Sequence, residues 1–123
     1  MEFFQQVPNT DLNDQKLKNL IQINNLTTLC ASINTIMSDK GNEGVIYCIW
    51  GEFNIKRETL KHGVRFSLLT CPHALAWTVT LDNANNKIVV HCTIDKKDED
   101  PDFIDSINEF MNDWADGLSK ALA

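Results

Sequence analysis

The sequence of 123 residues lacks several features that mark common functional classes. Its 11 lysines and arginines are outnumbered by 17 aspartates and glutamates, so it has no basic excess to neutralise a nucleic acid backbone or an anionic membrane surface. No apolar run approaches the roughly 20 residues of a membrane-spanning helix, and the start of the chain lacks the basic residues of a signal peptide. We therefore expect a cytoplasmic protein that binds neither nucleic acid nor membrane.

Cysteine and glycine are too sparsely placed to build several familiar sites. The cysteines lie about twenty residues apart, without a CxxC pair or the dense spacing of a disulfide-stapled secreted protein. They are Cys30, Cys48, Cys71 and Cys92. The five glycines form neither a GxGxxG fingerprint nor a phosphate-binding loop. The sequence predicts reduced thiols and no cofactor.

The length suits one domain. Residues 1–10 carry Phe3, Phe4 and Pro8 without periodicity, and this indicates a loosely ordered N-terminal segment. Residues 11–123 have the patterns of a single α+β domain.

The first part of that domain has helical spacing. Apolar residues recur three or four positions apart up to Ile21, and again from Leu26 to Met37. Asn24 and Asn25 separate the two sets and are better caps than helix interiors. Residues 11–38 therefore form either one long helix or, as we favour, a short helix and a second helix over about 25–38.

Four segments then have strand patterns. They are residues 45–56, 64–68, 75–82 and 88–94, each with alternating apolar and polar positions or many β-branched and aromatic residues. The last two are joined by an asparagine-rich turn, residues 82–86, that suits a hairpin. Such short connections predict antiparallel pairing.

The end of the chain is an amphipathic helix preceded by an acidic loop, residues 95–102. Asp100 is a plausible cap and Pro101 suits a first helical turn. One face of the helix is apolar, from Phe103 to Leu118, and the opposite face is largely acidic.

The order of elements predicts an α+β two-layer sandwich. It would contain an N-terminal helix (or two), a four-stranded antiparallel sheet, and a C-terminal helix packed on one sheet face. No element is left to cover the other face of the sheet, and we expect that face to bind a partner. Its predicted residues are Cys48, Trp50, Glu52, Arg65, Ser67, Thr78, Thr80, His91 and Thr93.

Trp50 is the centre of this candidate site, because aromatic residues with mixed polar neighbours are typical of protein interfaces. The alternative is a bulge at Gly51 that changes the strand parity and sends Trp50 inward.

Two other kinds of site are worth comparing with this interface. Cys71, His73 and His91 are the residues most able to bind a metal, but no pair has a recognised ligand spacing. Cys71 beside His73, oriented by Asp82 or Glu52, is the best arrangement for a cysteine- or histidine-dependent enzyme. Without a nucleophile elbow or a long pocket-forming loop, neither site is predicted.

The second half of the chain resembles the closing hairpin and helix of the type III secretion chaperones. The resemblance rests on residues 74–82, residues 87–92 and the helix over residues 103–114. It implies a small acidic cytosolic protein that binds other proteins. That family places a middle helix, which makes its dimer, where this chain has only residues 67–74, so any homodimer would need another surface.

The sequence thus predicts a small acidic protein-binding module of chaperone-like, adaptor or immunity type. Its negative charge favours a basic protein partner, and the fold is compatible with a homodimer. The alternatives are a small-molecule or metal-binding domain that uses the region of Trp50, His73 and His91, and a small enzyme.

Overall fold

The computed structural model describes residues 1–95 and 100–122. Within these residues, seven strands form one antiparallel sheet in the order β1-β7-β6-β5-β4-β3-β2. The strands are β1 (Glu2–Pro8), β2 (Ile33–Asp39), β3 (Glu43–Cys48), β4 (Gly51–Leu60), β5 (Gly63–Leu68), β6 (Ala76–Asp82) and β7 (Lys87–Thr93). The helical segments are α1 (Asp14–Leu20), the 3₁₀ turn η1 (Ile23–Asn25), α2 (Leu26–Leu29) and α3 (Pro101–Ala121).

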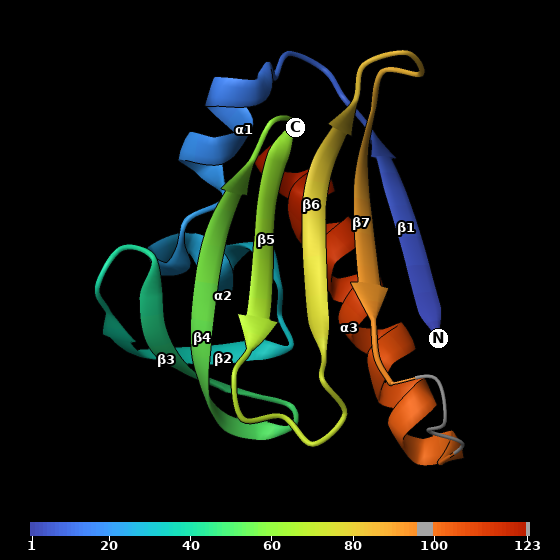
Figure 1. The fold of residues 1–123 in the computed structure, drawn as a ribbon. Helices are drawn as coiled ribbons and strands as arrows, with labels where there is room; N and C mark the ends of the chain where they lie inside the picture. Colours follow the sequence, from blue (N-terminus) through green and yellow to red (C-terminus); the bar gives the residue numbers. More distant parts are fainter. Residues whose placement is uncertain (96–99, 123) are drawn as a thin grey trace.

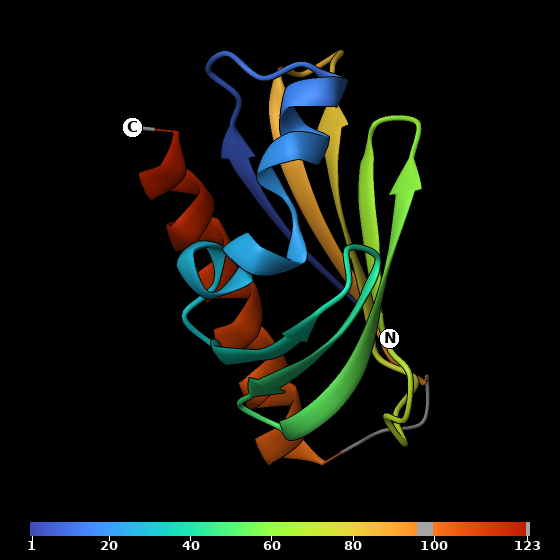
Figure 2. The same cartoon turned by 90° about the vertical axis from the view of Figure 1, so that its left-hand side faces the viewer.

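The helices share one face of the sheet. Figure 1 looks onto the opposite face, with α1, α2 and α3 behind the strands. Figure 2 shows the same two layers from the side, with the end of the sheet at β2 and β3 curled toward the helices. The α+β class is confirmed, and it leaves one broad face of the sheet open.

The core between the layers is aromatic. The Trp77 ring lies 5.2 Å from Phe66, 5.0 Å from Phe110 and 6.3 Å from Trp114, measured between ring centroids. All four side chains are at most 1 % exposed. Because β5, β6 and α3 each contribute to this cluster, it fixes the long helix against the middle of the sheet.

The predicted four-stranded sheet is wrong, since the described sheet has seven strands. One of the additional strands is β1, which pairs with β7 over its whole length from Glu2↔Thr93 to Pro8↔Lys87. The N-terminal segment expected to be loosely ordered is therefore part of the sheet. Because its partner strand β7 lies far along the chain, the local pattern of residues 1–10 does not identify the pairing.

The second helix predicted over residues 25–38 is also wrong. Only Leu26–Leu29 is helical there, and residues 33–39 form the edge strand β2. The β2–β3 register shifts between Ile33 and Thr35 and again between Ile36 and Ser38. These irregularities place Ile33 and Ile36, three residues apart, both against the core, which imitates the spacing of a helix.

The predicted strand over residues 45–56 is a hairpin of two strands. β3 and β4 pair up to Cys48↔Gly51 around a turn at residues 49–50, and Gly51 has a positive φ of 110°. Glycine adopts that backbone conformation without a steric penalty. The turn changes the parity, so Ile46 and Cys48 point inward before it and Phe53 and Ile55 point inward after it.

The C-terminal helix and its start are confirmed. The Asp100 side chain accepts a hydrogen bond from the backbone N–H of Asp102 at 3.0 Å, and Pro101 occupies the first turn. Of the predicted acidic loop, residues 96–99 lie outside the described residues. None of the described helices is both long enough and apolar enough to cross a membrane.

Candidate functional site

The uncovered face of the sheet is the largest candidate site. Alternate residues of each strand point to it, and cross-strand pairing places them in rows. One row runs across five strands and consists of Phe4, His91, Thr78, Arg65 and Glu58. In the described residues, no helix packs over this row (Figures 1 and 2).

Two sets of contacts order the side chains of this row. Arg65 Nη1 donates to Ser67 Oγ at 2.7 Å and lies 3.4 Å from Glu58 Oε1. The second set is at the β1 end of the face, where the His91 ring stacks on Phe4 at 4.3 Å and 6° between planes. His91 Nε2 also lies 2.9 Å from Glu2 Oε1.

The face combines polar rows with exposed apolar side chains. Phe4 is 61 % exposed, Leu69 53 % and Tyr47 51 %. Tyr47 pairs with Glu52, and both are on the outward positions of the β3–β4 hairpin. Exposed aromatic and aliphatic groups among hydrogen-bonding groups are typical of surfaces that bind proteins.

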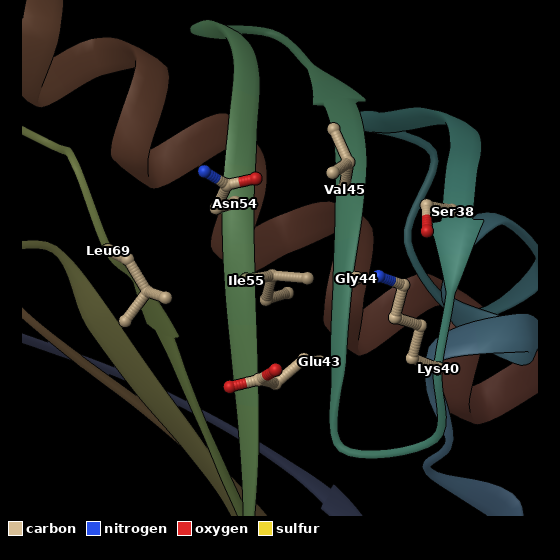
Figure 3. A pocket seen from close by; sticks show the side chains of 8 residues that line it. All are labelled: Ser38, Lys40, Glu43, Gly44, Val45, Asn54, Ile55 and Leu69. Atoms are coloured by element: carbon tan, nitrogen blue, oxygen red, sulfur yellow. The ribbon is translucent and has the colours of Figure 1, made fainter.

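A shallow hollow of about 190 Å³ interrupts the face at the β2–β3–β4 end. Val45 from β3, Asn54 from β4 and Leu69 from the β5–β6 connection surround it, with Lys40 and Glu43 beside them (Figure 3). Its floor is continuous because Ser38 pairs with Val45, Val45 with Asn54, and the Leu69 N–H donates to Asn54 O at 2.9 Å. The hollow can accept one projecting side chain of a partner.

Most residues expected on the open face lie there, and two do not. Glu52, Arg65, Ser67, Thr78, Thr80, His91 and Thr93 occupy its outward positions. Cys48 is 3 % exposed and points into the core, and Trp50 turns inward at the β3–β4 hairpin. Its Nε1 donates to Ser106 Oγ of α3 at 2.8 Å, and its ring packs on Phe110 at 4.9 Å. The expected centre of the interface is instead an anchor between the hairpin and α3.

Trp50 lines a separate small pocket near the β3–β4 hairpin, on the face of the sheet that carries the helices. Its volume is about 200 Å³, and its lining residues are Trp50, Phe53, Cys71, Pro72, His73 and Phe103. The His73 ring stacks on Phe103 at 4.1 Å. The pocket brings Cys71, His73 and Trp50 together, as expected, but His91 is on the other face of the sheet with Phe4 and Glu2.

The structure also shows where the other residues considered for catalysis or metal binding lie. Asp82 ends β6, whereas Cys71 and His73 precede the start of that strand, so Asp82 is about 20 Å away along the strand and cannot orient His73. In residues 1–95 and 100–122, no three His, Cys, Asp or Glu side chains gather in a way that could hold a metal ion.

Burial determines the chemistry of the other cysteines. It raises the pKa of the Cys30 thiol and that of the Cys92 thiol to about 12, and it raises the pKa of Cys48 as well. These thiols stay protonated and inert near neutral pH. Cys71 is the cysteine with partial exposure.

The sequence analysis missed Glu2, Phe4 and Tyr47 as members of the open face. For β1, a signal was present: Phe3 and Val7 alternate with Glu2 and Gln6, a short two-residue period. Tyr47 was expected on the inner face because the turn at residues 49–50 was not predicted.

Comparison with known proteins gives a fold but no function. No protein-family model matches the chain, and no curated protein matches it. The solved structure of protein XoxI from Bacillus cereus is similar, with a TM-score of 0.66, 14% identity, and coverage of 99% of this chain and 94% of that one. So is an uncharacterised protein from Bacillus thuringiensis, with a TM-score of 0.65, 14% identity, and coverage of 99% and 97%. The resemblance to type III secretion chaperones stays a prediction.

Proposed function

We propose that this chain is a protein-binding domain that engages its partner through the uncovered face of the sheet. The observation that carries the proposal is the breadth of that face. The row from Phe4 to Glu58 alone crosses five strands. Exposed Phe4 is part of this row, and exposed Tyr47 and Leu69 lie on the same face nearer to the β3–β4 hairpin. Binding of this kind suits a cytosolic chaperone-like, adaptor or immunity-type role and involves no chemical step.

The charge of the face suggests the chemistry of the partner. Five acidic side chains point outward or line the hollow against four basic ones, so the face is slightly negative. The acidic residues are Glu2, Glu43, Glu52, Glu58 and Asp82, and the basic residues are Lys40, Lys56, Arg65 and Lys87. A partner surface of mixed polarity with a small positive excess complements it, and complementary charge speeds association and improves specificity.

Binding of a small molecule is the second candidate, in the pocket lined by Trp50, Cys71 and His73. Pockets for drug-sized ligands are about 300–1,000 Å³, whereas this one is about 200 Å³. It can hold a small apolar group, and its size favours the open face as the main site.

Site-specific photo-crosslinking in the native host tests the proposal. A photoreactive residue replaces Thr78, in the middle of the open face, and in a control it replaces Asp116 on the exposed side of α3. Asp116 is the more exposed position, so random collisions would label the control more. We expect discrete protein adducts from position 78 and none from position 116. Adducts from position 116 alone, or from neither position, would contradict the proposal.

A further inference from the structure

Within residues 1–95 and 100–122, strand β1 pairs with β7 along one edge and with no strand along the other. Met1 and Ile94 exchange backbone hydrogen bonds of 3.2 and 3.1 Å, and the Asn9 N–H donates to Asn86 O at 2.9 Å. In an antiparallel ladder, hydrogen-bonded pairs alternate along the strand. The odd-numbered residues of β1 therefore bond to β7, and the backbone groups of Glu2, Phe4 and Gln6 point to the open edge.

The two edge strands of the sheet, β1 and β2, differ in how readily each could pair with a strand of another chain. The edge strand β2 is irregular at two places along its pairing with β3, and such irregularities discourage pairing with another chain. β1 pairs with β7 without any register shift over seven residues. It contains one charged residue, Glu2, and no lysine. The β1 edge has the regularity that accepts a further strand.

The helix beside this edge is uncharged on the side that faces it. Gln5 Nε2 of β1 donates to Asn112 Oδ1 of α3 at 2.7 Å, and this contact identifies the flank. The opposite flank contacts Trp50 through Ser106 and Ser32 through Asp113. Ile104, Asn108, Ala115 and Ser119 lie at helical spacing on the β1 side of Asn112, whereas Asp105, Glu109 and Asp116 lie at helical spacing on its solvent side.

The β1 flank of α3 differs from the rest of the helix in having no charged residues. α3 carries five acidic residues and one lysine, and they lie on its solvent side or on the other flank. Interfaces are depleted of charged residues at their centre. The strand edge and the helix flank therefore form a surface that is uncharged except for Glu2, with the acidic residues of α3 set back toward solvent.

We propose that two copies of this chain pair through β1 about a two-fold axis at Phe4, joining their sheets into one. In this register Phe4 lies opposite Phe4 of the second copy, and Glu2 lies opposite Gln6. Each of these pairs exchanges its outward backbone N–H and C=O groups. The register brings the most exposed large apolar side chain described, Phe4 at 61 %, into contact with its own copy, and leaves Pro8, which has no N–H, beyond the pairing.

A second copy fits this edge better than an unrelated strand because the arrangement is self-complementary. The single charged side chain of the strand lies opposite a glutamine, and Phe4, the one exposed phenylalanine among the described residues, lies opposite its own copy. Aromatic cross-strand pairs stabilise sheets. The proposal does not depend on the open face as a partner site, since Thr78 lies two strands away from this edge.

The first test introduces a proline that removes one backbone N–H at the open edge of β1 and leaves the hydrogen bonds to β7 in place. Gln6→Pro deletes the N–H that points to the open edge, and an edge strand tolerates proline there. Gln5→Pro, the control for this assignment, deletes an N–H bonded to β7 and should lower the melting temperature of the protein. Sedimentation equilibrium from low to high micromolar concentration should show a monomer–dimer equilibrium for the unmodified protein. Gln6→Pro should stay folded and monomeric. A protein that is monomeric throughout, or a dimer that Gln6→Pro leaves intact, overturns the proposal.

The second test reads the register. With Cys71→Ser as background, Phe4→Cys places two thiols opposite each other, at a Cα distance of about 5.5 Å that a disulfide can span. In Gln6→Cys, each new thiol instead lies opposite Glu2 of the other copy, so the two thiols are apart. Mild oxidation should give a covalent dimer with Phe4→Cys and none with Gln6→Cys. Equal cross-linking of both variants, or of Gln6→Cys alone, overturns the two-fold axis at Phe4.

Discussion

At the scale of single residues, burial separates the cysteines into two chemical classes. Cys30 and Cys92 are fully buried, and Cys71 is partly exposed in the wall of the small pocket. Because desolvation penalises the thiolate, the pKa of each buried thiol rises from 9.0 to about 12. The folded protein therefore holds these two protons at pH values where the unfolded chain has lost them.

This difference predicts an alkaline loss of stability. Above the unfolded pKa of 9.0 the unfolded chain binds fewer protons than the folded protein, so the free energy of unfolding falls as the pH rises toward 12. Each thiol contributes at most about 1.4 kcal/mol per pH unit. Urea unfolding at about pH 8 and about pH 10.5 measures the loss. A Cys30→Ala, Cys92→Ala double variant should lose less over that interval, and an equal loss would contradict the assignment.

Trp50 shows how far single residues could be predicted from the sequence. Its side of the sheet depended on whether the chain turns before Gly51. The chain turns at residues 49–50, and Gly51 follows the turn with a φ of 110°. Nothing in the alternation of residues 45–56 distinguishes a two-residue turn from one long strand. Arg65, Thr78 and His91 were placed correctly because their strands alternate without interruption.

At the scale of elements, α2 and α3 approach each other closely enough for backbone contact. A Cβ atom at Gly117 of α3 would overlap the backbone oxygen of Leu29, the last residue of α2. Only glycine allows this approach. Leu26 and Leu29 of the short helix are buried.

Gly117→Ala should therefore destabilise the protein, by about 2 kcal/mol in urea unfolding, because the two helices must separate. Helix propensity alone predicts the opposite sign, since alanine stabilises a helix by about 1 kcal/mol relative to glycine. Ser119→Ala, on the exposed side of α3, is the matched control and should change stability by less than about 0.5 kcal/mol. A Gly117→Ala protein as stable as the original would refute the close approach.

Elements specified by residues close together in the sequence were predicted correctly, whereas elements that depend on distant or irregular pairing were not. α3 and the β6–β7 hairpin were predicted with their caps and turn because local chemistry specifies both: an aspartate and a proline start the helix, and asparagines form the turn, where Asn86 has a φ of 54°. β1 needs a partner strand from the far end of the chain. β2 is irregular in a way that imitates helical spacing, so its local pattern gave the wrong element.

At the scale of the whole molecule, charge is divided between the two faces. Of the formal net charge of -6, α3 carries five acidic residues and one lysine, whereas the open sheet face has a nearly balanced mixture. The acidic side of α3 keeps the helix layer in solvent and leaves the sheet face available for contact. Pairing through β1 would extend that face across two copies.

A titration of the partner captured at position 78 tests the central claim most directly, that the open sheet face binds a protein. Glu58 lies in the row of outward side chains that crosses the face, beside Arg65, so Glu58→Lys adds repulsion against a partner surface with a positive excess. Glu109→Lys makes the same change of charge on the exposed side of α3. We predict a Kd at least tenfold higher for Glu58→Lys, about 1.4 kcal/mol, and within twofold of the original for Glu109→Lys. An unchanged Kd for Glu58→Lys, with a raised Kd for Glu109→Lys, would place the partner on the helix layer and contradict the account.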